Sequence, residues 1–398
     1  MIIKPRIRGF LCTTAHPAGC AAEVDEQIRI VQSAGRIQGG PRRVLIIGAS
    51  GGYGLATRVT AAFGCGADTL GVFFERPAEG NRTGSPGWYK SAAFTERAEA
   101  AGLYAANFAG DAFSAATKER VIEEIRSHVG QVDMVVYSLA AGARMLPDGS
   151  LARSALKPLG EPFSGTTIDL NTGEMRELSL EPAAPEEVTD TVKVMGGEDW
   201  ELWIAALLEA DVLARGCVTT NYTYLGSEVT WPIYHHGTIG KAKEDLDRAA
   251  GALAGSMAKI GGTAYVCVMK GLVTQAASAI PGMSLYLSLL FKIMKEQGTH
   301  EDCIDQTARL FNSRLFAGGD VPVDESGRVR LDDWELTDEV QDYVRRHWHE
   351  ISNDNLETLT DFAGYRQAFL SMHGFDVAGV DYSADVDANV SMNVISLP

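Results

Sequence analysis

Apolar runs and stretches of helical composition alternate along much of this chain. The runs at 44–47, 69–74 and 132–137 are rich in Val, Leu, Ile and Phe and are predicted strands. Because these runs are continuous, the strands are expected to be buried on both faces, as in a parallel sheet. Similar runs follow at 217–224 and 263–269. The pattern predicts an α/β fold: a Rossmann-like, doubly wound parallel sheet with helices on both faces.

A glycine cluster separates the first of these strands from a helix. The spacing is Gly48-x3-Gly52-x-Gly54, and residues 55–63 then have helical composition. Glycines at a strand-to-helix turn let the backbone approach a pyrophosphate, which the free N–H groups of the helix N-terminus would bind. This spacing is typical of short-chain reductases rather than of the G-x-G-x-x-G dehydrogenases. The alternative is a tight turn that binds no ligand.

The second strand ends in a carboxylate. Glu75 follows Phe74 about 20 residues after the glycines. A carboxylate there accepts hydrogen bonds from both ribose hydroxyls of adenosine and repels a 2′-phosphate, which favours NADH over NADPH. Arg76 follows at once and would soften that repulsion. An ordinary solvated strand end is the alternative interpretation of Glu75.

Three further strand ends complete a predicted dinucleotide site. Asp111 and Ala112 follow the apolar stretch at 103–109, where adenine would lie. Leu139 and Ala140 follow the strand at 132–137 and would lie against ribose and nicotinamide. After the strand at 263–269, the backbone groups of Leu272, Val273 and Thr274 would hold the nicotinamide carboxamide. Ligands of open α/β sheets bind at the carboxyl ends of the strands, where all these residues are expected.

A turn-rich segment interrupts the alternation of strands and helices. Within it, residues 167–178 alternate apolar and polar positions around Asn171-Thr172-Gly173, which predicts a β-hairpin. A helix over 199–213 follows. We expect a single large α/β domain, 1–398, of extended short-chain-reductase type. Its parts are an N-terminal hairpin and helix (1–43, the helix at 23–33), a dinucleotide-binding core (44–144 and 217–282), an insertion near the active site (145–198) and a mainly helical C-terminal part (283–398).

Composition narrows the possible partners and the compartment. The chain has 35 Lys+Arg and 52 Asp+Glu, a net charge of −17, which argues against binding to nucleic acid or anionic membranes. The six cysteines show neither C-x-x-C nor metal-ligand spacing, so we predict reduced thiols and no metal. The sequence has no apolar signal core and no run of 18 apolar residues. We expect a cytoplasmic monomer.

Candidate catalytic residues lie between 224 and 243. A Tyr hydroxyl beside a Lys ammonium is a common reductase device, because the phenol donates a hydrogen bond to an oxygen that gains negative charge. Tyr234 and Lys243 are separated by eight residues, which excludes the one-turn Tyr-x3-Lys geometry and predicts a tyrosine in a loop before the helix at 244–260. Tyr224, at a strand end, is alternatively a core residue with a satisfied hydroxyl. For His235 and His236 we favour structural roles.

These motifs together resemble a known family. Residues 1–17, Gly48–Gly54, 73–77, Tyr234-x8-Lys243 and 273–276 are similar to the bacterial NADH-dependent trans-2-enoyl-CoA/enoyl-ACP reductases of the large single-chain type. The resemblance implies Tyr234 as proton donor, Tyr224 as substrate-binding and Lys243 as a catalytic and cofactor contact. It also implies cofactor contacts at Gly48, Ala49, Ser50, Gly51, Gly52, Tyr53, Phe74, Glu75, Asp111, Ala112, Leu139, Ala140, Leu272, Val273 and Thr274.

The implied activity is reduction of the trans-2 double bond of enoyl thioesters by NADH in fatty acid synthesis. The substrate carrier is CoA or acyl carrier protein, which the sequence does not separate. The C-terminal region of this family has been called FAD-binding, but residues 284–398 have no flavin fingerprint and we predict no FAD. The helix around 283–294 is a candidate lining for an acyl channel. Two alternatives stay open: a carbonyl-reducing short-chain dehydrogenase, which predicts a three-residue Tyr–Lys gap and a nearby serine, and a noncatalytic NAD-sensing protein.

Overall fold

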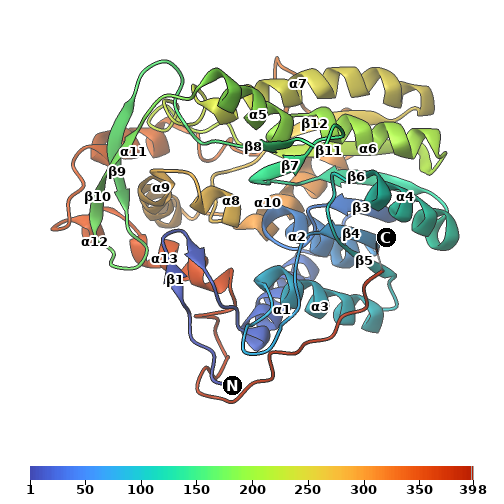
Figure 1. Ribbon diagram of the computed structural model, residues 1–398, viewed down its shortest axis with the longest axis horizontal. Coiled ribbons are helices and arrows are strands. Elements are labelled where there is room, and N and C mark those ends of the chain that lie inside the picture. The colour runs from blue at the N-terminus through green and yellow to red at the C-terminus, as the bar shows by residue number, and fades with distance from the viewer. Residues whose placement is uncertain (396, 398) are drawn as a thin grey trace.

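A seven-stranded parallel sheet forms the centre of the computed structural model, which describes residues 1–395 and 397 (Figure 1). Its strand order is β13-β12-β11-β6-β3-β4-β5, and every neighbouring pair is parallel. The order reverses between β3 and β6, which makes that position the switch point of the sheet. The strands are β3 (Arg43–Ile47), β4 (Asp68–Phe73), β5 (Ala105–Ala109), β6 (Val132–Tyr137), β11 (Leu213–Thr223), β12 (Thr263–Val268) and β13 (Val329–Arg330).

Helices cover both faces of the sheet, as the apolar runs predicted. In β3, Leu45 and Ile47 point into one core, whereas Val44 and Ile46 point into the other, because side chains alternate along a strand. Helices α4, α6 and α7 fill the first core, and α2 and α10 pack on the other face, with α1 and α3 beside α2 (Figure 1). Their bounds are α1 (Pro17–Ser33), α2 (Gly52–Val59), α3 (Pro86–Ala100), α4 (Ala115–Glu124), α6 (Glu198–Glu209), α7 (Thr238–Met257) and α10 (Cys303–Leu310).

Three predicted helix boundaries were wrong. α1 begins at Pro17 rather than at 23, since His16 accepts a hydrogen bond from the Gly19 amide and caps it. α7 begins at Thr238, so both lysines of the Tyr–Lys region lie within it. The helix predicted to reach 213 ends at Glu209, because Asp211 adopts a positive φ of 55° and the chain turns into β11.

The segment between β6 and α6 contains the predicted hairpin. Strands β9 (Phe163–Ile168) and β10 (Met175–Leu180) pair antiparallel, with Ile168 opposite Met175. A shorter pair, β7 (Ala143–Met145) and β8 (Leu151–Arg153), precedes it, and α5 (Pro185–Met195) follows. The Ile168 amide donates to Ser284 Oγ at 3.0 Å. The hairpin therefore packs on the start of α9 (Met283–Gln297).

The C-terminal part is mainly helical, but it also completes the sheet. α11 (Asp338–Trp348), α12 (Leu356–Leu359) and α13 (Phe362–Ser371) follow the edge strand β13, which the sequence pattern did not predict. The remaining short elements are the β1–β2 hairpin (Ile7–Arg8 and Leu11–Cys12), α8 (Gln275–Ser278), the 3-10 turn η3 (Ala258–Ile260) and the π turns η1 (Thr60–Cys65), η2 (Ile125–Val129) and η4 (Phe311–Leu315). Within residues 1–395 and 397, no helix is both long and apolar enough to cross a membrane.

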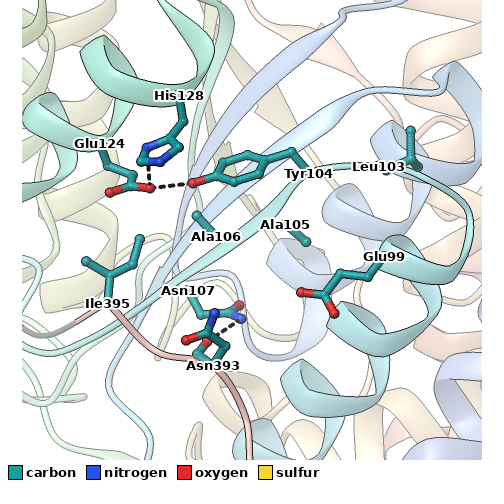
Figure 2. A pocket seen from close by; sticks show the side chains of 10 residues that line it. All are labelled: Glu99, Leu103, Tyr104, Ala105, Ala106, Asn107, Glu124, His128, Asn393 and Ile395. Carbon is teal, nitrogen blue, oxygen red and sulfur yellow. Dashed lines mark hydrogen bonds and ion pairs between the residues drawn. The ribbon is translucent and has the colours of Figure 1, made fainter.

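The C-terminal segment, residues 388–395, covers the opposite sheet edge. The Trp88 indole donates to the carbonyl of Val390 at 2.9 Å, and the Ile395 amide donates to the carbonyl of Asn107 at 2.8 Å. Ile395 thereby forms a parallel bridge with Phe108 of β5. Figure 2 shows Asn393 and Ile395 beside Asn107, at the wall of a cavity of about 250 Å³. The segment thus occupies hydrogen-bonding groups that an edge strand would otherwise expose.

Deleting residues 389–398 should therefore expose the edge of β5. We expect the Tm to fall by about 3–6 °C, the effect of losing a few hydrogen bonds and their packing in a chain of this size. The expected accompanying change is faster aggregation on warming, measured by light scattering. Asn393→Ala is the matched control: Asn107 bonds the main-chain carbonyl at 393, so this variant should melt like the parent. An unchanged Tm for the deletion would contradict a covering role.

Candidate active site

The glycine turn lies at the switch point of the sheet, where backbone segments crowd together. Gly48 has a φ of 90°, and a Cβ there would lie 2.1 Å from the carbonyl oxygen of Ser138, just after β6. A Cβ at Gly54 would lie 1.8 Å from the carbonyl oxygen of Gly48. Only glycine fits either position. Gly51, in contrast, faces open space and precedes α2 without a side-chain cap, so the N–H groups of this helix end are available to an anion.

The residues predicted to bind the adenosine ribose also lie together in the structure. Ser50 Oγ donates to Glu75 Oε1 at 2.7 Å, which holds the carboxylate against the glycine turn. Gly87, at the start of α3, leaves room for it, since a Cβ there would lie 2.1 Å from Glu75 Oε1. The Arg76 guanidinium donates to the Thr83 carbonyl at 2.9 Å and is engaged in its own loop. Phe74 is 83% exposed, so its ring offers free apolar surface beside Glu75.

The remaining cofactor candidates flank this turn at the same sheet edge. Asp111 and Ala112 follow β5, and Leu139 and Ala140 follow β6. Asp111 Oδ1 accepts from the Phe113 amide at 2.9 Å in a tight turn. Ala112 is buried, whereas Ala140 is exposed at the end of β6. The structure therefore brings these strand ends to one edge, as the sequence pattern predicted.

The loop after β12 contacts the glycine turn directly. The Tyr53 hydroxyl donates to the carbonyl of Lys270 at 2.7 Å. A Cβ at Gly52 would lie 3.3 Å from Thr274 Cγ2, so the stretch containing Leu272, Val273 and Thr274 borders the same space. Thr274 Oγ1 also caps α8 by accepting from the Ala277 amide. The two predicted cofactor segments thus form one continuous wall.

Tyr234 and Tyr224 lie together. Their ring centroids are 5.1 Å apart in an edge-to-face arrangement. Tyr234 occupies the turn between β11 and α7, as the eight-residue gap predicted, and is only 4% exposed. Burial raises the pKa of its phenol, which keeps the hydroxyl protonated. Among the described residues the Tyr234 hydroxyl has no hydrogen-bond partner, whereas the Tyr224 hydroxyl donates to Glu335 Oε1 at 2.8 Å.

Lys243 lies on α7, and burial dominates its electrostatics. Desolvation lowers the pKa of its ammonium to about 8, while the nearby Asp247 opposes the shift. Asp247 is itself paired with Arg328, whose Nε lies 2.9 Å from Oδ1. No hydrogen bond or ion pair joins Lys243 to Tyr234 in the part of the chain that the structure describes. Lys241, in contrast, is exposed and paired with Glu244.

Two groups of residues complete the description of this region. His235 and His236 are exposed and lie near Trp231, with the His235–Trp231 ring centroids 5.7 Å apart. In residues 1–395 and 397, no cluster of three or more His, Cys, Asp or Glu could hold a metal ion.

Glu335 was missed by sequence reasoning, because no motif surrounds it and only the tertiary fold brings it to Tyr224.

Comparison with known families covers nearly the whole chain. Residues 2–80 match the NAD(P)H binding domain of trans-2-enoyl-CoA reductase, and residues 82–316 match the trans-2-enoyl-CoA reductase catalytic region. An enoyl-[acyl-carrier-protein] reductase [NADH] of Edwardsiella ictaluri is 54% identical over 398 residues, 100% of both chains. A protein of that name from Aeromonas salmonicida, FabV, is 53% identical with the same coverage.

Solved structures agree with these matches. The trans-2-enoyl-CoA reductase of Clostridium acetobutulicum in complex with NADH superposes with a TM-score of 0.96 at 42% identity, covering 98% of each chain. The enzyme of Treponema denticola in complex with NAD has a TM-score of 0.94 at 47% identity, covering 99% of this chain and 100% of that one. The similarity extends to the insertion and to the C-terminal helices.

A third family model, the enoyl reductase FAD binding domain, matches residues 323–386. In the structure, α11 and α13 of this segment pack their apolar side chains against α9: Val340, Val344, Tyr365 and Phe369 are buried in one cluster with it. These side chains fill the space between the helices, and residues 323–386 contain no G-x-G-x-x-G sequence for a pyrophosphate. Its residues do not fit a flavin.

The cofactor residues, in contrast, fit a dinucleotide. The glycine turn leaves open space at Gly51, and Glu75 stands fixed beside it. The family models, full-length relatives and solved structures agree with this geometry. The chain belongs to the trans-2-enoyl-CoA reductase family.

Proposed function

We propose that Tyr234 is the hydrogen-bond and proton donor in an NADH-dependent reduction of enoyl thioesters. The protein reduces the trans-2 double bond of enoyl-CoA or enoyl-ACP substrates to saturated acyl thioesters, a step of fatty acid synthesis. The observation that carries the residue assignment is that Tyr234 is only 4% exposed, yet its hydroxyl, at the cofactor edge of the sheet, has no hydrogen-bond partner among residues 1–395 and 397. Such a group is available to an atom of the substrate.

Tyr234 stabilises charge as it develops on the substrate. Bound NADH supplies the hydride that the β-carbon accepts. Negative charge then builds on the thioester oxygen, to which the Tyr234 hydroxyl donates a hydrogen bond. The raised pKa of Tyr234 suits this role, because the phenol stays a donor across the physiological range. Protonation of the α-carbon, by Tyr234 directly or through water, completes the saturated product.

Other residues bind and orient the reactants. Gly48 through Tyr53 would hold the pyrophosphate, Phe74, Glu75, Asp111 and Ala112 the adenosine, and Leu139, Ala140 and Leu272 through Thr274 the nicotinamide riboside. Lys243 would contact the ribose with its ammonium. Tyr224 would orient the thioester. We assign the first turns of α9 to the acyl chain, since Tyr234 shares one apolar cluster with Met283 and Leu287.

The net charge of the chain bears on how it would recognise the carrier of its substrate. A chain of net charge −17 offers no general attraction to the phosphates of CoA or acyl carrier protein, so carrier recognition would be local. We propose that the enzyme works as a cytoplasmic monomer, with acyl carrier protein as a transient partner.

Tyr234→Phe should reduce turnover by about 10²-fold or more, the effect of losing one oxyanion donor. NADH oxidation with crotonyl-CoA, followed by absorbance, measures it. The Tm should change little, because the lost hydroxyl makes no hydrogen bond to any of the residues that the structure describes. Tyr224→Phe should be milder and act mainly on substrate orientation. A larger loss for Tyr224→Phe would assign the donor to the other tyrosine, and no turnover of any enoyl thioester by the parent would contradict the function itself.

The Lys243 ammonium should make NADH use dependent on pH. With a pKa of about 8 in the free enzyme, Lys243 is charged below that pH and neutral above it. The kcat/KM for NADH, which reports free-enzyme groups, should therefore fall as pH rises through about 8. Lys243→Met should lower turnover, raise the KM for NADH and remove this fall. Lys241→Met, on the exposed lysine nearby, should retain the parent profile; an unchanged profile in Lys243→Met would exclude the assignment.

Glu75→Ala should shift cofactor preference toward NADPH. Removing the carboxylate relieves its repulsion of a 2′-phosphate, so the ratio of kcat/KM for NADPH to that for NADH should rise by about tenfold or more. Activity with NADH should fall less than activity with NADPH rises. Glu79→Ala, which removes an exposed carboxylate four residues along, is the control and should leave the ratio unchanged. The same ratio in both variants would mean that Glu75 does not face the ribose.

A further inference from the structure

A buried glutamate joins three segments of the site. Glu335 lies between β13 and α11 and has no exposed surface. Its Oε1 accepts from the Tyr224 hydroxyl at 2.8 Å and from the Tyr286 hydroxyl of α9 at 2.5 Å. Its Oε2 accepts from the Gly271 amide at 2.6 Å. One carboxylate therefore holds the end of β11, the start of the loop after β12, and α9 in fixed positions.

The groups around Glu335 are hydrogen-bond donors, so its position suits an acceptor and not another donor. Three N–H and O–H groups point at its two oxygens, and Lys270 adds a nearby positive charge. Burial raises the pKa of Glu335, while Lys270 and these donors oppose the shift. Burying a charged pair rarely stabilises a fold relative to apolar residues of similar size. The buried Glu335 carboxylate is therefore better explained by a role in positioning the groups that bind it than by a contribution to stability.

Those groups are parts of the proposed active site. A Cβ at Gly271 would lie 3.1 Å from the Tyr224 hydroxyl, so the tyrosine and the loop touch where Glu335 binds both. The Tyr53 hydroxyl ties the same loop to the glycine turn through the carbonyl of Lys270. The rings of Tyr224 and Tyr234 pack in an edge-to-face arrangement. The position of Tyr224 relative to both the donor and the cofactor loop therefore depends on Glu335.

We propose that Glu335 is a positioning residue of the reductase reaction, which fixes the Tyr224 hydroxyl against the loop at 271–274 so that the enoyl thioester is oriented beside Tyr234. The inference rests on the roles proposed above for Tyr224 and Tyr234. It gives the segment at 323–386, whose residues do not fit a flavin, a part in catalysis through one side chain.

Glu335→Gln tests the proposal, because the amide keeps the shape but replaces one of the two acceptor oxygens with a donor, so the three surrounding donors cannot all be satisfied. When Glu335→Gln is introduced into the parent enzyme, we expect kcat/KM for crotonyl-CoA to fall about 10–100-fold. In a Tyr224→Phe background the same substitution should cause a loss at least fivefold smaller, since residues that act through one another are not additive. A merely structural role would lower activity by the same factor in both backgrounds.

Glu124→Gln is the matched control. Glu124 is also a buried glutamate that accepts a tyrosine hydroxyl, that of Tyr104, as Figure 2 shows. Tyr104 precedes β5 and Glu124 ends α4, so this pair lies at the amino ends of the strands, opposite the proposed site. The variant should lower the Tm but leave kcat/KM within about twofold of the parent value. It separates lost stability from lost positioning.

Equal losses for Glu335→Gln in both Tyr224 backgrounds, or a loss as small as that of Glu124→Gln, would overturn the proposal. If the glutamine variant is recovered unfolded, Glu335→Asp takes its place in both backgrounds: it keeps the charge but shortens the side chain by one methylene, and the same dependence on Tyr224 is expected. Failure of the proposed function is distinguishable, because the parent enzyme would then not oxidise NADH with crotonyl-CoA.

Discussion

The single direction of all seven strands is the constraint on which this structure depends. Parallel strands place their carboxyl ends at one edge, so residues far apart in sequence meet there without any local signal that pairs them. The reversal of strand order between β3 and β6 separates the loops that leave these two strands, and the space between them becomes the crevice. Glycine at 48 is then obligatory, because the chain leaving β6 passes within van der Waals distance of it.

Polar groups around the crevice fall into two classes. Four hydroxyl groups donate hydrogen bonds to protein acceptors and so hold the residues that line the crevice in place: those of Ser50, Tyr53, Tyr224 and Tyr286. The Tyr234 hydroxyl, in contrast, has no hydrogen-bond acceptor in the described part of the chain, although the residue is only 4% exposed, and under the proposed mechanism it donates to the substrate. Preorganised electrostatic catalysis requires this combination: lining residues whose hydrogen bonds are already made, and one donor left for the substrate. Little then has to move when charge develops.

Sequence reasoning succeeded where the cause of a structure is local. Continuous apolar runs, the glycine spacing and the turn at Asn171-Thr172-Gly173 located the strands, the turn after β3 and the β9–β10 hairpin. The eight-residue gap placed Tyr234 in a loop. It failed where the cause is distant: Glu335 lies 111 residues from Tyr224 and has no recognisable neighbours, and the two residues of β13 are strand only because β12 offers an edge. The exact limits of α1 and α6 depended on a histidine cap and on the positive φ of Asp211.

The cover on β5 has a consequence for biosynthesis. Asn107 is translated 286 residues before Asn393, the partner that bonds its side chain. Any sheet that forms before residue 388 is made has the edge of β5 uncovered, and an uncovered edge strand is a template for pairing with other extended chains. A chain cut short before residue 388 would have all seven strands and the proposed site but an uncovered β5 edge. The segment at 388–395 is thus made long after the strand that it covers, and it shields that strand from self-association.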